Sequence, residues 1–266
     1  GAGAHLVSFQ GTDTLPGIMF ARRYYHEQMA GFSIPAAEHS TITSWGREHE
    51  ADAFRNMLEK FPTGLVAVVS DSYDIFHACE QLWGRELRDL VLRRDGTLIV
   101  RPDSGYPPEI VVRVLEILGR AFGFTVNAKG FRVLNPHVRV IQGDGIDYAM
   151  LGLVLGAMET AGWSADNIAF GSGGGLLQKL DRDLQKCAIK CSAIDRDGVW
   201  HDVHKDPITD PGKRSKAGRL MLINDGGYHT VRVGESNLPN LLELAFRNGE
   251  VLRDQTFADI RRLALL

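Results

Sequence analysis

Polar residues that could do chemistry recur at the ends of apolar segments. Asp71, Asp103 and Asp144 each follow a short apolar run, and Ser172 follows the next such run. The intervals between them are each about the length of one strand plus one helix. Carboxylates at strand ends can hold Mg²⁺ or ribose hydroxyls, although Asp71 with Ser72 would equally suit the cap of a helix. The repeat therefore indicates a polar site at one end of several parallel strands.

A glycine run suggests that one ligand of this site carries phosphate. Residues 171–175 read Gly-Ser-Gly-Gly-Gly and separate an apolar segment from a helical pattern that begins at Leu176. Backbone N–H groups in such a turn can approach a phosphate because no side chain blocks them, and the dipole of the following helix favours negative charge. A tight turn without a ligand is the alternative, but the length of the run favours phosphate.

Two further pairs could take part in the chemistry. Arg101 and Asp103 are two residues apart, so on a strand they face the same side and could clamp a sugar phosphate. His39 follows Glu38 at the end of an apolar segment, and it could be a base, a metal ligand, a phosphoryl acceptor or a purely structural histidine.

A basic segment lies further along the chain. Residues 205–219 are rich in Lys and Arg, and together with Arg182 and Lys190 they could surround a polyphosphate. A solvated surface is the alternative.

The elements that must position these groups follow from hydrophobic periodicity. We expect parallel strands at residues 5–9, 33–37, 65–69, 98–100, 138–141 and 167–170, and helices at 43–61, 73–92, 107–118, 146–162 and 176–187, of which 146–162 is the more buried. Polar groups at the end of every strand are typical of a (β/α) barrel, whereas a doubly wound sheet would bind its ligand at one switch point. The sequence thus predicts an α/β fold with a barrel over residues 1–190.

The pattern changes in the last quarter of the chain, where short apolar runs are broken by Gly, Pro and charge. We expect residues 191–266 to form a smaller α+β portion that carries the basic segment. Within it, residues 231–233 and 251–257 are predicted to be antiparallel strands, and 257–266 a short helix.

Composition narrows the functional classes. The chain has 266 residues and a formal net charge of −3, which argues against a dedicated nucleic-acid binder. No apolar run is long enough to span a bilayer, and residues 1–10 lack the features of a signal peptide. Three cysteines, an odd number, suggest reduced thiols and a cytoplasmic location.

Several motifs together resemble one enzyme family. They include Ala-Ala-Glu-His-Ser at 36–40, Arg-Pro-Asp-Ser-Gly at 101–105 and Gln-Gly-Asp-Gly at 142–145. The remaining matching segments are 11–14, 33–43, 69–74, 168–179, 205–216 and 246–249. The chain closely resembles the nicotinamide phosphoribosyltransferases, a branch of the type II phosphoribosyltransferase family, over nearly its whole length.

The resemblance implies a reaction and its accessories. Nicotinamide and phosphoribosyl pyrophosphate would give nicotinamide mononucleotide and pyrophosphate in NAD salvage. ATP would stimulate the reaction by phosphorylating a histidine, Mg²⁺ would assist, and no tightly bound organic cofactor is expected. The family also implies a homodimer and a longer amino-terminal part, so we expect a barrel that is incomplete at its amino end and needs an upstream polypeptide.

The resemblance also implies site residues. His39 would be the phosphoryl acceptor, with Asp71 orienting it, and Asp13 would accept a hydrogen bond from the nicotinamide amide. Catalytic roles would fall on Glu38, His39, Asp71 and Asp103. Substrate contacts would come from Asp13, Ser33, Ile34, Ala36, Ser72, Ile99, Arg101, Asp103, Gly143, Asp144, Gly173 and Gly174. Phosphates of substrate or ATP would meet Arg182, Lys190, Lys205 and Lys213, and Asp71 and Asp103 would hold the metal.

Three other interpretations remain open. A nicotinate phosphoribosyltransferase has the same fold and reaction type, but Asp13 should repel the carboxylate of nicotinate. A flavin-binding barrel oxidoreductase could use the glycine run for the flavin phosphate. A non-catalytic fragment is the third.

Overall fold

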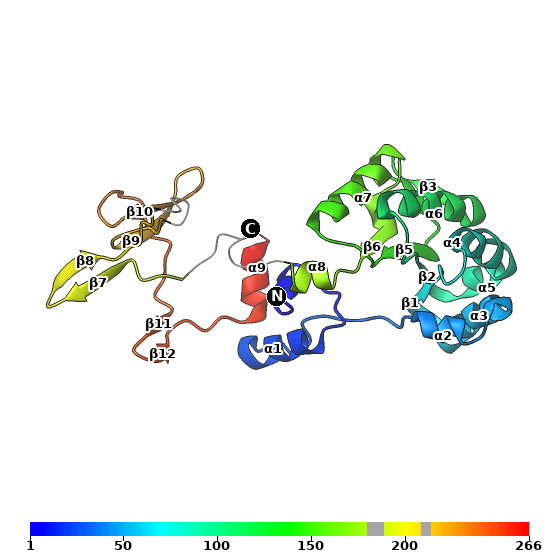
Figure 1. Cartoon of the computed structure of the whole chain (residues 1–266), viewed down its shortest axis with the longest axis horizontal. Coiled ribbons are helices and arrows are strands. Elements are labelled where there is room, and N and C mark those ends of the chain that lie inside the picture. Colours follow the sequence, from blue (N-terminus) through cyan, green and yellow to red (C-terminus); the bar gives the residue numbers. More distant parts are fainter. Residues whose placement is uncertain (180–188, 209–213, 266) are drawn as a thin grey trace. The chain divides into compact units, whose positions relative to one another are not determined.

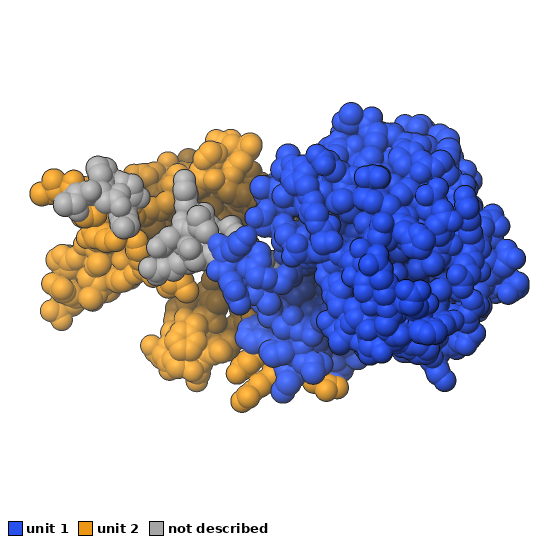
Figure 2. Space-filling model, turned by 45° about the vertical axis from the view of Figure 1, so that its right-hand side comes forward, with its two compact units in different colours: residues 1–20, 28–180 blue, residues 21–27, 181–266 orange. Residues whose placement is uncertain are grey.

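The computed structural model describes residues 1–179, 189–208 and 214–265. The chain divides into two compact units (Figure 2), the first made of residues 1–20 and 28–180, the second of 21–27 and 181–266. The domain boundary expected at residue 190 stays a prediction.

A parallel sheet forms the centre of the first unit (Figure 1). Its strands are β1 (Thr63–Val69), β2 (Asp95–Arg101), β5 (Val138–Gln142) and β6 (Ile168–Phe170), hydrogen-bonded in the order β1-β2-β5-β6. The spatial order follows the chain order without reversal, as in a barrel and unlike a doubly wound sheet. The α/β fold with a parallel sheet is confirmed, whereas closure into a barrel is not.

The first two expected strands do not form: the strand expected at residues 5–9 is wrong, and the one expected at 33–37 is reduced to a single bridge. Residues 5–9 contain instead the 3₁₀ helix η1 (Ala4–Val7), in which Leu6 alone is buried. Residues 33–37 make a single parallel bridge, between Ala36 and Ala67, because Pro35 lacks an N–H and can only accept a bond, from Ala67 N. A second parallel bridge joins Gly11 to Phe32, just outside the two expected strands.

Two expected long helices are interrupted. The region 43–61 contains the end of α2 (His39–Thr43), η2 (Arg47–His49) and α3 (Glu50–Lys60), and Gly46, with φ of 83°, separates the first two. The region 73–92 contains α4 (Ile75–His77), the π-helical η3 (Ala78–Glu86) and α5 (Arg88–Arg93). The helix expected at 107–118 is confirmed as α6 (Pro107–Phe122), with proline in its first turn.

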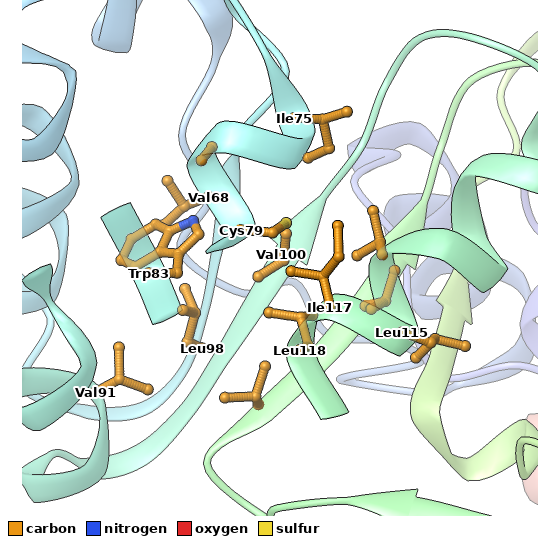
Figure 3. Close-up of a cluster of buried hydrophobic side chains, with 14 of the residues drawn as sticks. Val68, Ile75, Cys79, Trp83, Val91, Leu98, Val100, Leu115, Ile117 and Leu118 are labelled. Atoms are coloured by element: carbon orange, nitrogen blue, oxygen red, sulfur yellow. The ribbon is translucent and has the colours of Figure 1, made fainter. Parts of the chain in front are cut away.

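Helices cover the sheet through one hydrophobic core (Figure 3). Trp83 of η3 stacks on Phe54 of α3 at 4.4 Å between ring centroids, and Val68 and Val100 of the sheet lie in the same cluster. The Trp83 indole N–H donates to Ser70 Oγ at 3.0 Å. This bond ties the core to the position just before Asp71, at the carboxyl end of β1.

The remaining helices and strands of the first unit are shorter or more exposed. α7 (Tyr148–Thr160) confirms the helix expected in the region 146–162, but it buries only Val154 and Met158, so the expectation that this helix is more buried is wrong. The sequence also missed the hairpin of β3 (Phe124–Val126) and β4 (Arg132–Leu134). The other helical elements are α1 (Leu15–Tyr25), η4 (Ala165–Asn167) and α8 (Gly174–Leu177), and the last residues of α1 belong to the second unit. Of the helix expected at 176–187, residues 180–187 lie outside the described part.

The second unit is built from hairpins and one helix. The hairpins pair β7 (Ala193–Arg196) with β8 (Val199–Asp202), β9 (Leu220–Asn224) with β10 (Tyr228–Arg232), and β11 (Phe246–Arg247) with β12 (Glu250–Val251). α9 (Phe257–Ala264) confirms the expected terminal helix, whereas the strand expected at 251–257 ends at Val251. Across the described ranges, the helices all fall short of the length and apolarity needed to cross a membrane.

Candidate functional site

The carboxyl ends of the four parallel strands gather most of the predicted site residues. Asp71 lies two residues beyond β1, and Arg101 is the last residue of β2. Gly143 directly follows β5, and the glycine run at 171–175 directly follows β6. Because the strands are parallel and adjacent, these groups share one edge of the sheet.

His39 and Asp71 form the most specific contact at this edge. His39 Nε2 lies 3.1 Å from Asp71 Oδ1, and the side chains are 39% and 4% exposed respectively. The buried carboxylate holds the ring in place, while the ring itself reaches solvent. If Nε2 donates its proton to Asp71, Nδ1 is the unprotonated nitrogen that can act as a nucleophile.

Glu38 serves a different purpose from the one its place beside His39 suggests. Its carboxylate accepts hydrogen bonds from the Ser40 N–H, at 2.7 Å, and from the Ser40 hydroxyl. Together with Thr41 it forms a capping box at the start of α2. The bonds from Ser40 lower the pKa of Glu38 below its ordinary value. Glu38 therefore fixes the helix that carries His39, and its catalytic role stays a prediction.

Asp13 and Ser33 lie together although they are twenty residues apart. The Ser33 hydroxyl donates a hydrogen bond to Asp13 Oδ1. The adjacent backbone bond from Thr12 N–H to Phe32 O, 2.9 Å long, fixes the two segments side by side. Both side chains are exposed, and Asp13 Oδ2 is left to accept from a ligand. Ile34 is half-buried and Ala36 exposed on the same segment.

Arg101 and Asp103 make the pair expected from their spacing. Arg101 Nε lies 3.6 Å from Asp103 Oδ1, and about a quarter of each side chain is exposed. A Cβ on Gly143 would lie 3.5 Å from the same oxygen, so the turn after β5 adjoins the pair. Ile99, two residues before Arg101, is buried.

Three buried polar atoms at this edge have no hydrogen-bond partner within the described structure: Ser72 Oγ, Arg101 Nε and Gln142 Oε1. Native proteins leave few such atoms, because each costs about 1–3 kcal/mol. Their clustering indicates that a polar ligand completes the site. Gln142 is the functional candidate that sequence reasoning missed; a polar residue ending a buried apolar strand was the available signal.

The two glycine turns pack against each other. A Cβ on Gly171 would lie 3.4 Å from the Cα of Gly143, and a Cβ on Gly175 only 2.6 Å from the carbonyl oxygen of Ile146. The Ser172 hydroxyl donates to the same carbonyl at 2.9 Å. By contrast, a Cβ on Gly173 would meet nothing within 4 Å. Gly175 is thus needed for packing, whereas the side of Gly173 on which a Cβ would lie is open.

Asp144 follows Gly143 in the turn after β5. Its carbonyl oxygen accepts a hydrogen bond from Gln142 Nε2 at 3.0 Å, and its side chain is exposed. Gly174, one residue after Gly173, is the first residue of α8. The positions expected at the ribose 5-phosphate therefore all lie in the two glycine turns.

None of the four basic residues expected to bind phosphate belongs to the described part of the first unit. Arg182 and Lys213 lie outside the described residues. Lys190 and Lys205 belong to the second unit and are exposed. Two hydrogen bonds join Lys205 to Ser215. The Lys205 N–H donates to the Ser215 hydroxyl at 2.9 Å, and the Ser215 N–H donates to the Lys205 carbonyl at 3.0 Å.

The two carboxylates expected to bind a metal each contact a basic side chain, Asp71 that of His39 and Asp103 that of Arg101. In the described ranges, no three His, Cys, Asp or Glu side chains come close enough to hold an ion alone. Mg²⁺ commonly binds one or two carboxylates together with water and substrate phosphates. Asp71 and Asp103 fit that mode, and their metal role stays a prediction.

Residues 2–250 match the model of the nicotinate phosphoribosyltransferase family, so this chain belongs to that family. Among its relatives are proteins named nicotinamide phosphoribosyltransferase. One from Xanthomonas campestris pv. campestris is 53% identical over 98% of this chain and 58% of its own length. One from Mycoplasma pneumoniae is 38% identical over 82% of this chain and 49% of its own length. One from Acinetobacter baylyi is 30% identical over 97% of this chain and 56% of its own length. The chain spans about half the length of these relatives.

Proposed function

We propose that this chain supplies the phosphoribosyl-transfer site of a nicotinamide phosphoribosyltransferase that works in NAD salvage. The observation that carries the proposal is the 53% identity to the Xanthomonas protein of that name over 98% of the chain. The site geometry supports it, because a histidine–aspartate pair, an arginine–aspartate pair and two glycine turns share one sheet edge.

The proposed chemistry is a displacement at the anomeric carbon of phosphoribosyl pyrophosphate. The ring nitrogen of nicotinamide forms the new bond to this carbon as the bond to pyrophosphate breaks, and the pyrophosphate leaves with its bonding electrons. The transition state resembles an oxocarbenium ion, so positioning and charge neutralisation supply most of the acceleration. Mg²⁺, when bound, neutralises charge on the leaving group.

Each part of the site has a role in this scheme. Asp13 Oδ2 accepts from the amide of nicotinamide, since Oδ1 is engaged by Ser33. Arg101 and Asp103 hold the ribose and its charged groups. The backbone around Gly143 and Gly173 receives the 5-phosphate.

His39 is the proposed site of ATP coupling. Its Nδ1 attacks the terminal phosphorus of ATP, a nitrogen–phosphorus bond forms, and ADP leaves. Asp71 keeps the proton on Nε2 and stabilises the positive ring, which makes it a positioning residue for His39. The barrel closure, the homodimer, the cytoplasmic location and the need for an upstream polypeptide complete the proposal and come from the family resemblance.

The decisive experiment supplies purified protein with phosphoribosyl pyrophosphate and either nicotinamide or nicotinate, with and without ATP. It measures nicotinamide mononucleotide in the first case and nicotinate mononucleotide in the second. It should be run on the 266-residue chain and on the chain joined to an upstream segment of the kind that the family resemblance implies. Product from nicotinamide that rises with ATP is expected when the upstream part is present. Absence of product in every combination would leave the non-catalytic interpretation.

Nicotinate phosphoribosyl transfer is the second candidate, because the family model carries that name. The same assay separates the two: preference for nicotinate in the wild-type protein would overturn the role given to Asp13.

A further inference from the structure

A second pocket lies beside the candidate site and shares no residue with it. The cavity measures about 380 Å³ and lies between the start of α3 and the segment that leads into α4 and η3. Its charged and aromatic lining comprises Arg47, Glu48, Glu50, Tyr73, Asp74, His77 and Glu86. This volume falls within the range of small-molecule sites.

Glu50 is the unusual member of this lining. The residue is only 5% exposed, and its Oε1 is buried without a hydrogen-bond partner in the described structure. Burial, with smaller contributions from Asp74 and Asp71 and against the opposing charge of Arg47, raises the pKa of Glu50 to about 7. When ionised, as it is at pH 8, a carboxylate in this setting gains from any cation that donates a hydrogen bond to it.

The charges around the pocket favour a cation over an anion. Glu86 lies 3.3 Å from Arg55 and is compensated there. Glu48, Glu50 and Asp74 then face the single guanidinium of Arg47, which lies 5.4 Å from the centroid of the Tyr73 ring. The pocket is therefore net negative.

The size and spacing favour an organic ion over a metal. Within the described ranges, no three acidic, His or Cys groups come close enough to ligate one metal ion. A larger ion can contact well-separated carboxylates at once, and Arg47 over the Tyr73 ring shows that this lining already accommodates a cationic group. We propose that this pocket binds a small organic cation bearing an ammonium group, with the Glu50 carboxylate as its principal partner.

The test follows backbone amide shifts by NMR in the 266-residue chain during titration at pH 8. The probe is 1,4-diaminobutane, 1-butanol is the neutral control and MgCl₂ the metal arm. The diamine should shift the amides of Ala51, Tyr73 and His77, which line the pocket. Absence of these shifts, or equal shifts with 1-butanol, overturns the proposal, as does MgCl₂ acting at lower concentration than the diamine.

A matched pair of variants tests the partner. Glu50→Gln keeps the shape but removes the charge, so diamine affinity should fall at least tenfold. Glu59→Gln removes an exposed charge from the same helix outside the pocket and should leave the affinity unchanged. Equal affinity in Glu50→Gln and wild type contradicts the assignment, and the wild-type shifts decide the matter independently if Glu50→Gln fails to fold.

Discussion

The coupling between His39 and Asp71 can be tested by removing one charge. Asp71→Asn keeps the volume of the side chain and an oxygen that can still accept from His39 Nε2, but it removes the negative charge. The proposed function requires that charge to stabilise the positive ring during phosphorylation. We therefore expect Asp71→Asn to lower the amount of phosphohistidine formed from ATP.

The size of the effect follows from the geometry of the pair. A hydrogen bond to an ionised group contributes about 1.5–3 kcal/mol, and each ~1.4 kcal/mol corresponds to a tenfold change. The 3.1 Å contact and the 4% exposure of the Asp71 side chain favour a strong interaction, whereas the 39% exposure of His39 allows solvent to screen it. We expect the lower end of the range, roughly a tenfold fall.

The assay is phosphohistidine formation from radiolabelled ATP, with ATP stimulation of synthesis as a second readout. Asp52→Asn is the matched control, because Asp52 lies 3.0 Å from His49 in an exposed pair outside the site. Phosphohistidine in Asp71→Asn at the wild-type level would refute the role of the pair. A fall of equal size in the control would show that the loss is not specific.

Three further predictions concern base choice, the glycine turns and pH. Asp13→Asn should reduce the preference for nicotinamide over nicotinate by about tenfold, the cost of one charge-assisted bond, measured as the ratio of kcat/KM values. Gly175→Ala should lower the free energy of unfolding by about 1–3 kcal/mol in denaturant titrations, because its Cβ would lie 2.6 Å from the Ile146 carbonyl oxygen. Gly173→Ala should leave the free energy of unfolding unchanged but lower the affinity for the phosphorylated substrate. The pKa of Glu50 in the folded state, about 7, exceeds its ordinary value of 4.5, so the native state binds more protons than the unfolded state. The free energy of unfolding should therefore fall as the pH rises from 4.5 to 7. Glu50→Gln should remove this fall, and a pH profile of stability parallel to that of the wild type would contradict the prediction.

The positions of the four strands of the central sheet were the most predictable part of the fold. β1, β2, β5 and β6 match the expected apolar segments, because residues such as Val66, Val100 and Val140 are buried in a parallel sheet whose strands read as apolar runs. Helix lengths were less predictable. A positive φ at Gly46 divides one expected helix although the apolar periodicity continues past it.

Contacts between residues far apart in the sequence were the part of the site that local patterns could not predict. Sequence proximity suggested Glu38 as the acidic neighbour of His39, and only the family resemblance implied Asp71, thirty-two residues away, which contacts His39 in the structure. Such a pairing depends on how α2 lies against the end of β1, which no local pattern encodes. The Arg101–Asp103 pair was predictable for the opposite reason, because two residues on one strand face the same side.

The same sheet edge explains how a rigid core and a reactive site are combined. Trp83 anchors Ser70 from within the core, and Ser70 N–H donates to the Arg101 carbonyl at 3.0 Å, so the ends of β1 and β2 are fixed together. Beyond this point the chain carries buried polar atoms, such as Gln142 Oε1, without partners. A polar ligand that satisfied them would gain hydrogen bonds without having to order the backbone first, because the core has already fixed its position. The stability of the core and the affinity of the site are thus linked at the strand ends, and substitutions such as Trp83→Phe should disturb ligand binding as well as folding.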